Sequence, residues 1–161
     1  MAACCDWYYT GFMLNTETPA AQHASLDQYP TADLVTVLGT AGDSTIIGAV
    51  KAAKEHGKGI VVDLIGVADK ETRAREVTAL GVEFVEMHAG LDEQAEEGFT
   101  FQTLLTDGAN SGVAFSVAGG VNASTIASVQ QSGASVAVAG GAIYGASDPA
   151  AAAAELRAAI V

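Results

Sequence analysis

The sequence predicts an α/β protein built from about five parallel βα units. Short apolar runs, rich in Val and Ile, recur roughly every 20 to 30 residues, which is the length of one βα unit. The runs are nearly continuous rather than alternating, as in strands buried on both faces. Helical patterns lie between them. The predicted strands are Leu34–Leu38, Ile60–Ile65, Val82–Met87, Ala114–Ala118 and Val136–Ala139.

The helical patterns between these runs carry start and stop signals. Asp69 and Asp148 stand where an N-cap residue is expected, and Gly57, Gly81 and Gly133 each follow a final helical residue. The predicted helices are Ser44–His56, Lys70–Leu80, Phe99–Gly112, Ala123–Ser132 and Pro149–Ile160. The pattern over Phe99–Gly112 is the weakest of these, because Asp107-Gly108 interrupts it.

Residues 1–31 do not share this rhythm. We therefore divide the chain into an N-terminal segment, residues 1–31, and a (β/α) domain, residues 32–161. Asp6–Leu14 has the composition of a strand, and the remainder of the segment is a polar connection. A closed eight-stranded barrel needs at least about 200 residues. A chain of 161 residues is therefore expected to form an incomplete barrel.

Composition argues against several classes of function. The formal net charge is -12 with seven basic residues and no basic cluster, which disfavours binding to nucleic acid or to an anionic membrane. No apolar run is long enough to cross a membrane. The two cysteines, Cys4 and Cys5, are adjacent and not spaced for a disulfide framework or a zinc site. The N-terminus does not read as a signal peptide, so a cytoplasmic location is expected.

A doubled glycine signature is the strongest functional motif. Val-Ala-Gly-Gly ends at Gly119-Gly120 and again at Gly140-Gly141, each time after a predicted strand. Paired glycines expose backbone N–H groups that can hold a phosphate. The alternative is that both pairs only form tight turns. Two such turns at adjacent strand ends favour phosphate binding.

The residues at strand ends are the candidates for catalysis: Thr40, Asp63, Glu86, His88 and Ser116, of which Glu86 and His88 share a face of their strand. Two of them, both ionisable, are the predicted catalytic groups. His88 follows the third apolar run, where a histidine facing a cleft can act as acid, base or hydrogen-bond donor. Asp63 lies within the second run, where a buried carboxylate needs a partner, either functional or structural. No lysine stands at a strand end, which argues against Schiff-base catalysis. The sequence shows no compact cluster of carboxylates and histidines, so no metal-ligating residues are predicted.

Two long stretches carry a resemblance to a known family. Residues 32–95, which contain GKGIVVDLIGV and EMHAGLDEQA, resemble 3-hexulose-6-phosphate synthases. So do residues 115–161, which contain FSVAGGVNAS and VAVAGGAIYG. These enzymes belong to the orotidine-5'-monophosphate decarboxylase superfamily of TIM barrels, so the resemblance implies the carboxyl-terminal part of a (β/α)8 barrel.

The resemblance implies an activity, a cofactor and partners. Such enzymes are lyases of the ribulose monophosphate pathway that join formaldehyde to D-ribulose 5-phosphate with Mg2+, and they form homodimers. Gly119, Gly120, Gly140 and Gly141 correspond to the family's phosphate site, and His88 to its strand-end histidine. The related 3-keto-L-gulonate-6-phosphate decarboxylases carry an arginine where this chain has Leu91.

One part of the family pattern has no counterpart in residues 1–31. The family's first three strands carry acidic metal ligands and an Asp-x-Lys-x-x-Asp motif, and nothing in this segment matches them. The resemblance thus leaves three alternatives for the chain. It is an active synthase whose remaining groups come from another chain or another arrangement, a catalytically inactive phosphosugar-binding protein, or the sister decarboxylase.

Overall fold

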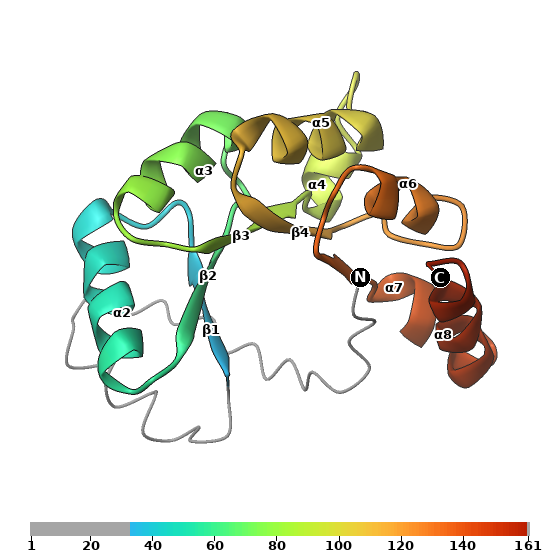
Figure 1. The fold of residues 1–161 in the computed structure, drawn as a ribbon. Coiled ribbons are helices and arrows are strands. Elements are labelled where there is room, and N and C mark those ends of the chain that lie inside the picture. Colours follow the sequence, from blue (N-terminus) through green and yellow to red (C-terminus); the bar gives the residue numbers. More distant parts are fainter. Residues whose placement is uncertain (1–32, 161) are drawn as a thin grey trace.

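The centre of the molecule is a sheet of five parallel strands in the order β1-β2-β3-β4-β5. The computed structural model describes residues 33–160. Figure 1 shows the strands in a curved arc, with α2, α3, α5 and α6 along its outer side. Within the described residues β1 and β5 do not pair, so the arc stays open, as the incomplete barrel predicts. The strands are β1 (Leu34–Leu38), β2 (Gly59–Asp63), β3 (Phe84–His88), β4 (Ala114–Ala118) and β5 (Val136–Val138).

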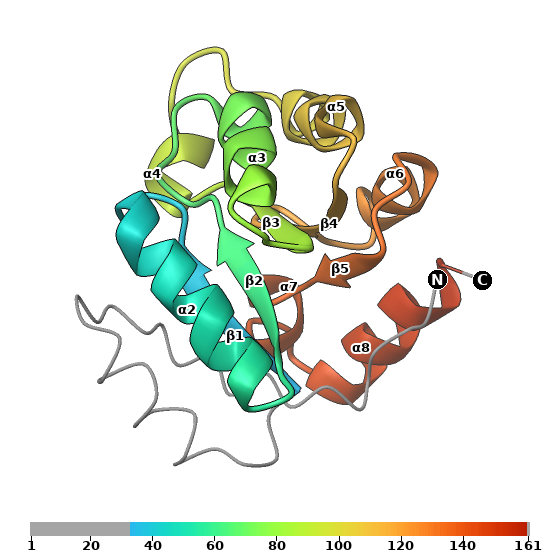
Figure 2. The same ribbon diagram turned by 60° about the vertical axis from the view of Figure 1, so that its left-hand side comes forward.

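The helices follow the predicted order, with two short additions. All five predicted helices are present, and α4 and α7, four residues each, occupy the loops after β3 and β5. Figure 2 shows α8 beside the β5 end of the sheet. The helices are α2 (Asp43–Glu55), α3 (Lys70–Ala79), α4 (Leu91–Gln94), α5 (Phe101–Ser111), α6 (Ile126–Gln131), α7 (Gly141–Tyr144) and α8 (Pro149–Ala158).

Alternating strand residues separate the core from the inner face of the arc. One set, including Val62, Val85 and Val117, is fully buried in the hydrophobic core with apolar residues of the helices. Because successive side chains of a strand point to opposite faces, the intervening residues point inward. Asp63 and Glu86 belong to this inner set, and the strand register pairs them directly. The register therefore brings polar groups of separate strands into one row.

The predicted interruption in α5 is wrong. The helix runs without a break through Gly108, and its Thr100 side chain caps the start by accepting from the Thr103 amide. A Cβ at position 108 would lie 2.4 Å from the ring of Phe115. The glycine therefore lets α5 pack closely on β4, and this contact stabilises the helix where propensity alone favours a break.

The helix start signals have mixed outcomes. Asp69 and Asp148 are N-caps, as predicted, and accept hydrogen bonds from Thr72 and Ala151 amides. The predicted helix at Ala123–Ser132 begins only at Ile126, because the side chain of Asn122 closes a local turn by accepting from the Ser124 amide. The predicted strand Asp6–Leu14 and the N-terminal segment lie outside the described residues. No helix in residues 33–160 is long and apolar enough to cross a membrane.

Candidate functional site

A cleft of about 780 Å3 opens at the carboxyl ends of the strands. In parallel α/β proteins this is where ligands bind. The inward residues of β1, β2 and β3 line one side, including Thr36, Asp63 and Glu86. The glycine turns after β4 and β5 line the other side. The cleft therefore unites both kinds of residue that the sequence singles out.

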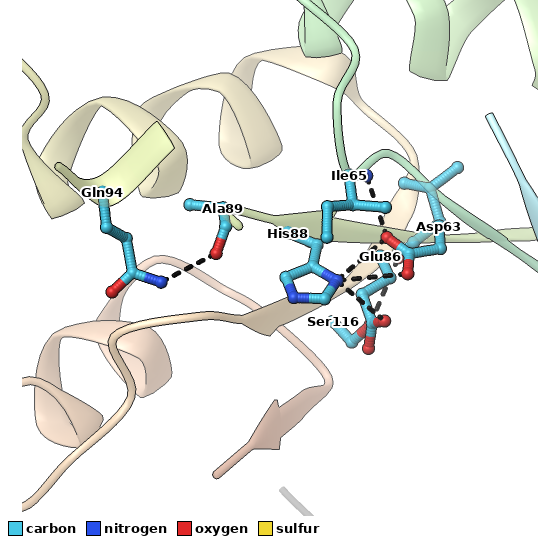
Figure 3. Close-up of polar contacts among 8 residues, drawn as sticks. Asp63, Ile65, Glu86, His88, Ala89, Gln94 and Ser116 are labelled. Carbon is cyan, nitrogen blue, oxygen red and sulfur yellow. Dashed lines mark hydrogen bonds and ion pairs between the residues drawn. The ribbon is translucent and has the colours of Figure 1, made fainter. Parts of the chain in front are cut away.

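His88 and Asp63 form a direct pair across β2 and β3. The Nδ1 atom of His88 lies 3.1 Å from each carboxylate oxygen of Asp63 (Figure 3). The Ile65 amide also donates to Asp63 Oδ1, at 2.9 Å, which fixes the carboxylate. With Nδ1 donating to Asp63, the neutral ring has Nε2 as a proton acceptor. This is the arrangement that orients a histidine for proton transfer.

Glu86 joins this pair and was not among the predicted catalytic residues. Its carboxylate is 4% exposed and accepts a hydrogen bond from Ser116 Oγ at 3.3 Å. Its Oε2 lies 3.9 Å from His88 Nδ1. Burial, with the negative charge of Asp63, raises the pKa of Glu86 to about 7. Burial by itself lowers the pKa of His88, but the hydrogen bond to Asp63 and the surrounding carboxylates raise it above 6.5.

The expectation of no carboxylate–histidine cluster is wrong. One ligand atom from each of Asp63, Glu86 and His88 lies within 4.8 Å of the others, close enough to share a metal ion. The sequence hides this cluster because Asp63 lies 25 residues before His88. Part of the cluster is visible in the sequence, because Glu86 and His88 alternate on one strand. The position of Asp63 beside Glu86 depends on the register between the two strands, which the sequence pattern does not give.

These raised pKa values predict that stability falls as the pH rises. The pKa values of Glu86 and His88 are higher in the folded protein than in the unfolded chain. Each group therefore contributes stability that is fully present below its unfolded-chain pKa, 4.5 for Glu86 and 6.5 for His88. This stability is lost as the pH rises through the pKa of the folded protein. Glu86→Gln should therefore stabilise the protein at pH 8 by about 1–3 kcal/mol relative to the parent. At pH 5 the difference should be small. Urea unfolding at both pH values checks this, and an equal difference at both would contradict it.

The first glycine turn has a geometry that requires glycine. Gly119 and Gly120 have φ values of 81° and 77°, in the left-handed region. A Cβ at Gly119 would lie 2.0 Å from the carbonyl oxygen of Ala89. The side chains of Asn122 and Thr125 donate to the Gly120 carbonyl, which holds the turn in place.

The second turn differs from the first, so the two glycine pairs are not equivalent. Gly140 has a φ of -108°, and Gly141 has no left-handed φ. The side-chain atom nearest to a Cβ at Gly141 would be the Tyr144 hydroxyl oxygen, at 3.6 Å. No hydrogen bond from the amides of Gly120 or Gly140 to another residue of 33–160 occurs. These amides are available to an anion in the cleft.

Sequence reasoning missed two further residues that line this part of the cleft. Tyr144 is 80% exposed and lies beside the second turn. Gln94 lies beside the first turn, where its Nε2 donates to the Ala89 carbonyl at 2.8 Å. Both stand on the short helices α4 and α7, which the sequence pattern did not reveal. A run of four residues is too short to show helical periodicity.

The fold and the cleft together define a (β/α)-barrel type of protein with an open cleft at the strand ends. The chain belongs to the orotidine 5'-phosphate decarboxylase / HUMPS family, whose model matches residues 15–156. The resemblance noted in the sequence therefore assigned the family correctly.

Curated relatives in this family include several synthases. The chain is 71% identical over 129 residues to the 3-hexulose-6-phosphate synthase of Mycobacterium gastri. The aligned region covers 80% of this chain and 62% of the relative. It is 51% identical over 126 residues to the 3-hexulose-6-phosphate synthase of Methylomonas aminofaciens. That aligned region covers 78% of this chain and 60% of the relative. The chain thus spans about three fifths of these relatives.

A solved structure supports the same assignment. The crystal structure of a 3-hexulose-6-phosphate synthase superposes with a TM-score of 0.84 at 63% identity. The superposition covers 91% of this chain and 70% of the other. The five-stranded arc therefore has the architecture of a synthase barrel over the part that the two share.

Proposed function

We propose that this chain carries the phosphate-binding and histidine part of a 3-hexulose-6-phosphate synthase site. The proposed reaction is the condensation of formaldehyde with D-ribulose 5-phosphate. The observation that carries the proposal is the meeting of the His88–Asp63 pair and both glycine turns in one cleft. The high identity to named synthases gives this pairing its chemical interpretation.

The phosphate end of the substrate fits the glycine side of the cleft. Backbone amides at Gly120 and Gly140 can donate to a phosphate without opposing side chains. The chain has a net charge of -12, and no lysine or arginine among residues 33–160 lines the cleft. Backbone dipoles therefore supply the local positive potential in this proposal.

His88 is the proposed proton carrier at the reacting end. The condensation forms a bond between a substrate carbon and the carbon of formaldehyde. Over the whole reaction, the proton that leaves the substrate carbon is balanced by the proton that the formaldehyde oxygen gains. The His88 ring, with Nδ1 held by Asp63, can deliver that proton from Nε2. A raised pKa keeps part of the His88 population protonated near neutral pH.

The donor set at the cluster fits a magnesium ion. Mg2+ prefers carboxylate oxygens, and Asp63 and Glu86 offer two that lie within reach of one centre. When bound, Mg2+ would stabilise negative charge that develops on the oxygens of the substrate. Two buried carboxylates also lie side by side here, and their mutual repulsion helps to raise the pKa of Glu86. A bound cation would relieve this repulsion, which favours its binding.

Magnesium binding is expected to depend on pH. Mg2+ should raise the melting temperature by a few degrees at pH 8, where Glu86 is ionised, and by little at pH 5.5, where its proton competes with the ion. Asp63→Asn should remove the effect. Thermal unfolding with Mg2+ and with a chelator measures it, with Asp148→Asn, outside the cleft, as the control. An equal rise in Asp63→Asn would show that the ion binds elsewhere.

A second candidate is a catalytically inactive phosphosugar-binding protein. No lysine among residues 33–160 lines the cleft, and this favours the inactive protein. By the resemblance, the active enzymes carry such a lysine on their third strand. Lys70 does not substitute, because its amine is engaged by Glu93 at 2.6 Å. We propose that the chain forms a homodimer. Because a second copy has the same sequence, an active site would need the family's third-strand groups from a different chain or from another arrangement of this one.

An assay of formaldehyde consumption with ribulose 5-phosphate and Mg2+ separates the two candidates. It should be paired with isothermal titration of ribulose 5-phosphate. Turnover supports the synthase, and binding without turnover supports the inactive protein. A protein that neither binds ribulose 5-phosphate nor turns it over would contradict both candidates. Turnover of 3-keto-L-gulonate 6-phosphate instead would favour the sister decarboxylase.

A further inference from the structure

Lys70 is a buried cation outside the proposed chemistry. It is the first residue of α3, and its side chain is 5% exposed. Its Nζ lies 2.6 Å from Glu93 Oε1 and donates to the Val67 carbonyl at 3.0 Å. Glu93 belongs to an acidic run that follows His88, but its carboxylate is only 28% exposed because it pairs with Lys70.

This ion pair connects the two loops that follow the catalytic pair. Lys70 ends the loop that begins after Asp63, and Glu93 stands on α4, which begins three residues after His88. The loops also pack together beside the pair. A Cβ at Gly90 would lie 3.4 Å from Ile65 Cδ1, which is ordinary contact distance.

The helix α4 touches the first glycine turn as well. Gln94, its last residue, donates to the Ala89 carbonyl, the same oxygen that a Cβ at Gly119 would strike. Positions of a Cβ at Gly119 and Gly120 lie 3.0 and 3.5 Å from the Gln94 amide atoms. The α4 helix therefore lies between the Lys70 contact and the first turn.

A helix of four residues does not hold its position by its own hydrogen bonds. Closing a first turn costs more conformational freedom than one hydrogen bond returns. None of the residues of α4 is buried, so apolar packing does not fix it either. Among residues 33–160, the side-chain hydrogen bonds that hold α4 are the distant one from Lys70 to Glu93 and the local one from Gln94 to the Ala89 carbonyl.

We propose that Lys70 and Glu93 are positioning residues whose ion pair holds α4 against the first glycine turn. Through Gln94, the pair keeps Gly119 and Gly120 in the shape that accepts a phosphate. The last step, an effect on phosphate affinity, rests on the proposed function. The first step, the ordering of α4 and of the turn, does not.

Hydrogen exchange of the ligand-free protein tests the first step. Lys70→Met keeps the length of the side chain and removes the charge. The Gln94 and Ala95 amides donate to the Gly90 and Asp92 carbonyls, and the Ala89 amide donates to the Ala118 carbonyl just before the first turn. These three amides should exchange about tenfold faster than in the parent, whereas those of α8 should not change. Lys70→Arg should restore much of the protection. Lys51→Met removes an exposed pair with Glu55 at 3.9 Å and serves as the control.

Unchanged exchange at Gln94 and Ala95 in Lys70→Met would overturn the proposal. So would fast exchange that Lys70→Arg fails to slow, because the effect would then come from lost packing rather than from the ion pair. If Lys70→Met does not fold, Glu93→Gln provides the same test from the more exposed side. The same changes in Glu93→Gln support the proposal, and their absence overturns it.

Titration with inorganic phosphate tests the second step. Lys70→Met and Glu93→Gln should each weaken phosphate binding by about five- to tenfold, while Lys51→Met binds like the parent. The double variant should lose no more than either single change, because both remove one interaction. A parent that binds no phosphate, with exchange still faster in Lys70→Met, would defeat the proposed function and leave the ordering role in place. Parent-like phosphate affinity in both single variants would overturn the second step.

Discussion

Gly119→Ala should be the most damaging single change in the cleft. Its φ of 81° disfavours any Cβ, and the added carbon would lie 2.0 Å from the backbone oxygen of Ala89. Neither atom belongs to a flexible side chain, so the turn must move. We expect a loss of about 3 kcal/mol of stability and no measurable phosphate binding. Urea unfolding and isothermal titration measure the two effects.

Gly57→Ala is the matched control for this substitution. Gly57 also has a left-handed φ, 65°, but a Cβ there meets nothing within 4 Å, and the residue lies outside the cleft. It should cost only about 1 kcal/mol and leave phosphate binding unchanged. Equal losses in both variants would show that the contact with Ala89 has no special effect.

His88→Ala should separate turnover from phosphate binding. If the chain is an active synthase, loss of a general acid or base should lower kcat by about 10²–10⁴-fold. Phosphate affinity should stay within about twofold of the parent, because the glycine amides and not the imidazole are proposed to hold the phosphate. Steady-state kinetics and phosphate titration of the same preparation provide both numbers.

His56→Ala is the control for the imidazole, since this residue caps α2 away from the cleft. It should retain parent turnover and parent phosphate affinity. A His88→Ala variant with full turnover would remove His88 from the proposed mechanism. A variant that loses phosphate binding would instead place the phosphate near the imidazole.

The order and type of the main elements could be read from the sequence because buried parallel strands leave near-continuous apolar runs. Leu34–Leu38 and Ala114–Ala118 match their predicted bounds without change. The second strand ends at Asp63 rather than Ile65, because the Asp63 side chain binds the Ile65 amide and turns the chain. Apolar composition alone does not reveal such a local hydrogen bond.

The site was predicted only in part. Gly119, Gly140, Asp63 and His88 do line one cleft, because residues at strand ends meet at one edge of a parallel sheet. The role of Glu86 could not be derived in the same way, since it depends on register between strands. Lys70 and Glu93 are 23 residues apart, and no periodic pattern links them.

The most direct test of the account locates the ligand by NMR. Inorganic phosphate added to the 15N-labelled protein should shift the amide signals of Gly120, Val121 and Gly140 selectively. Ribulose 5-phosphate should shift the same signals and, in addition, the ring resonances of His88. Signals of α8, outside the cleft, should stay in place. Shifts that miss both glycine turns, or a sugar phosphate that leaves His88 unaffected, would contradict the proposal that this cleft binds the phosphate at one end and reacts at the other.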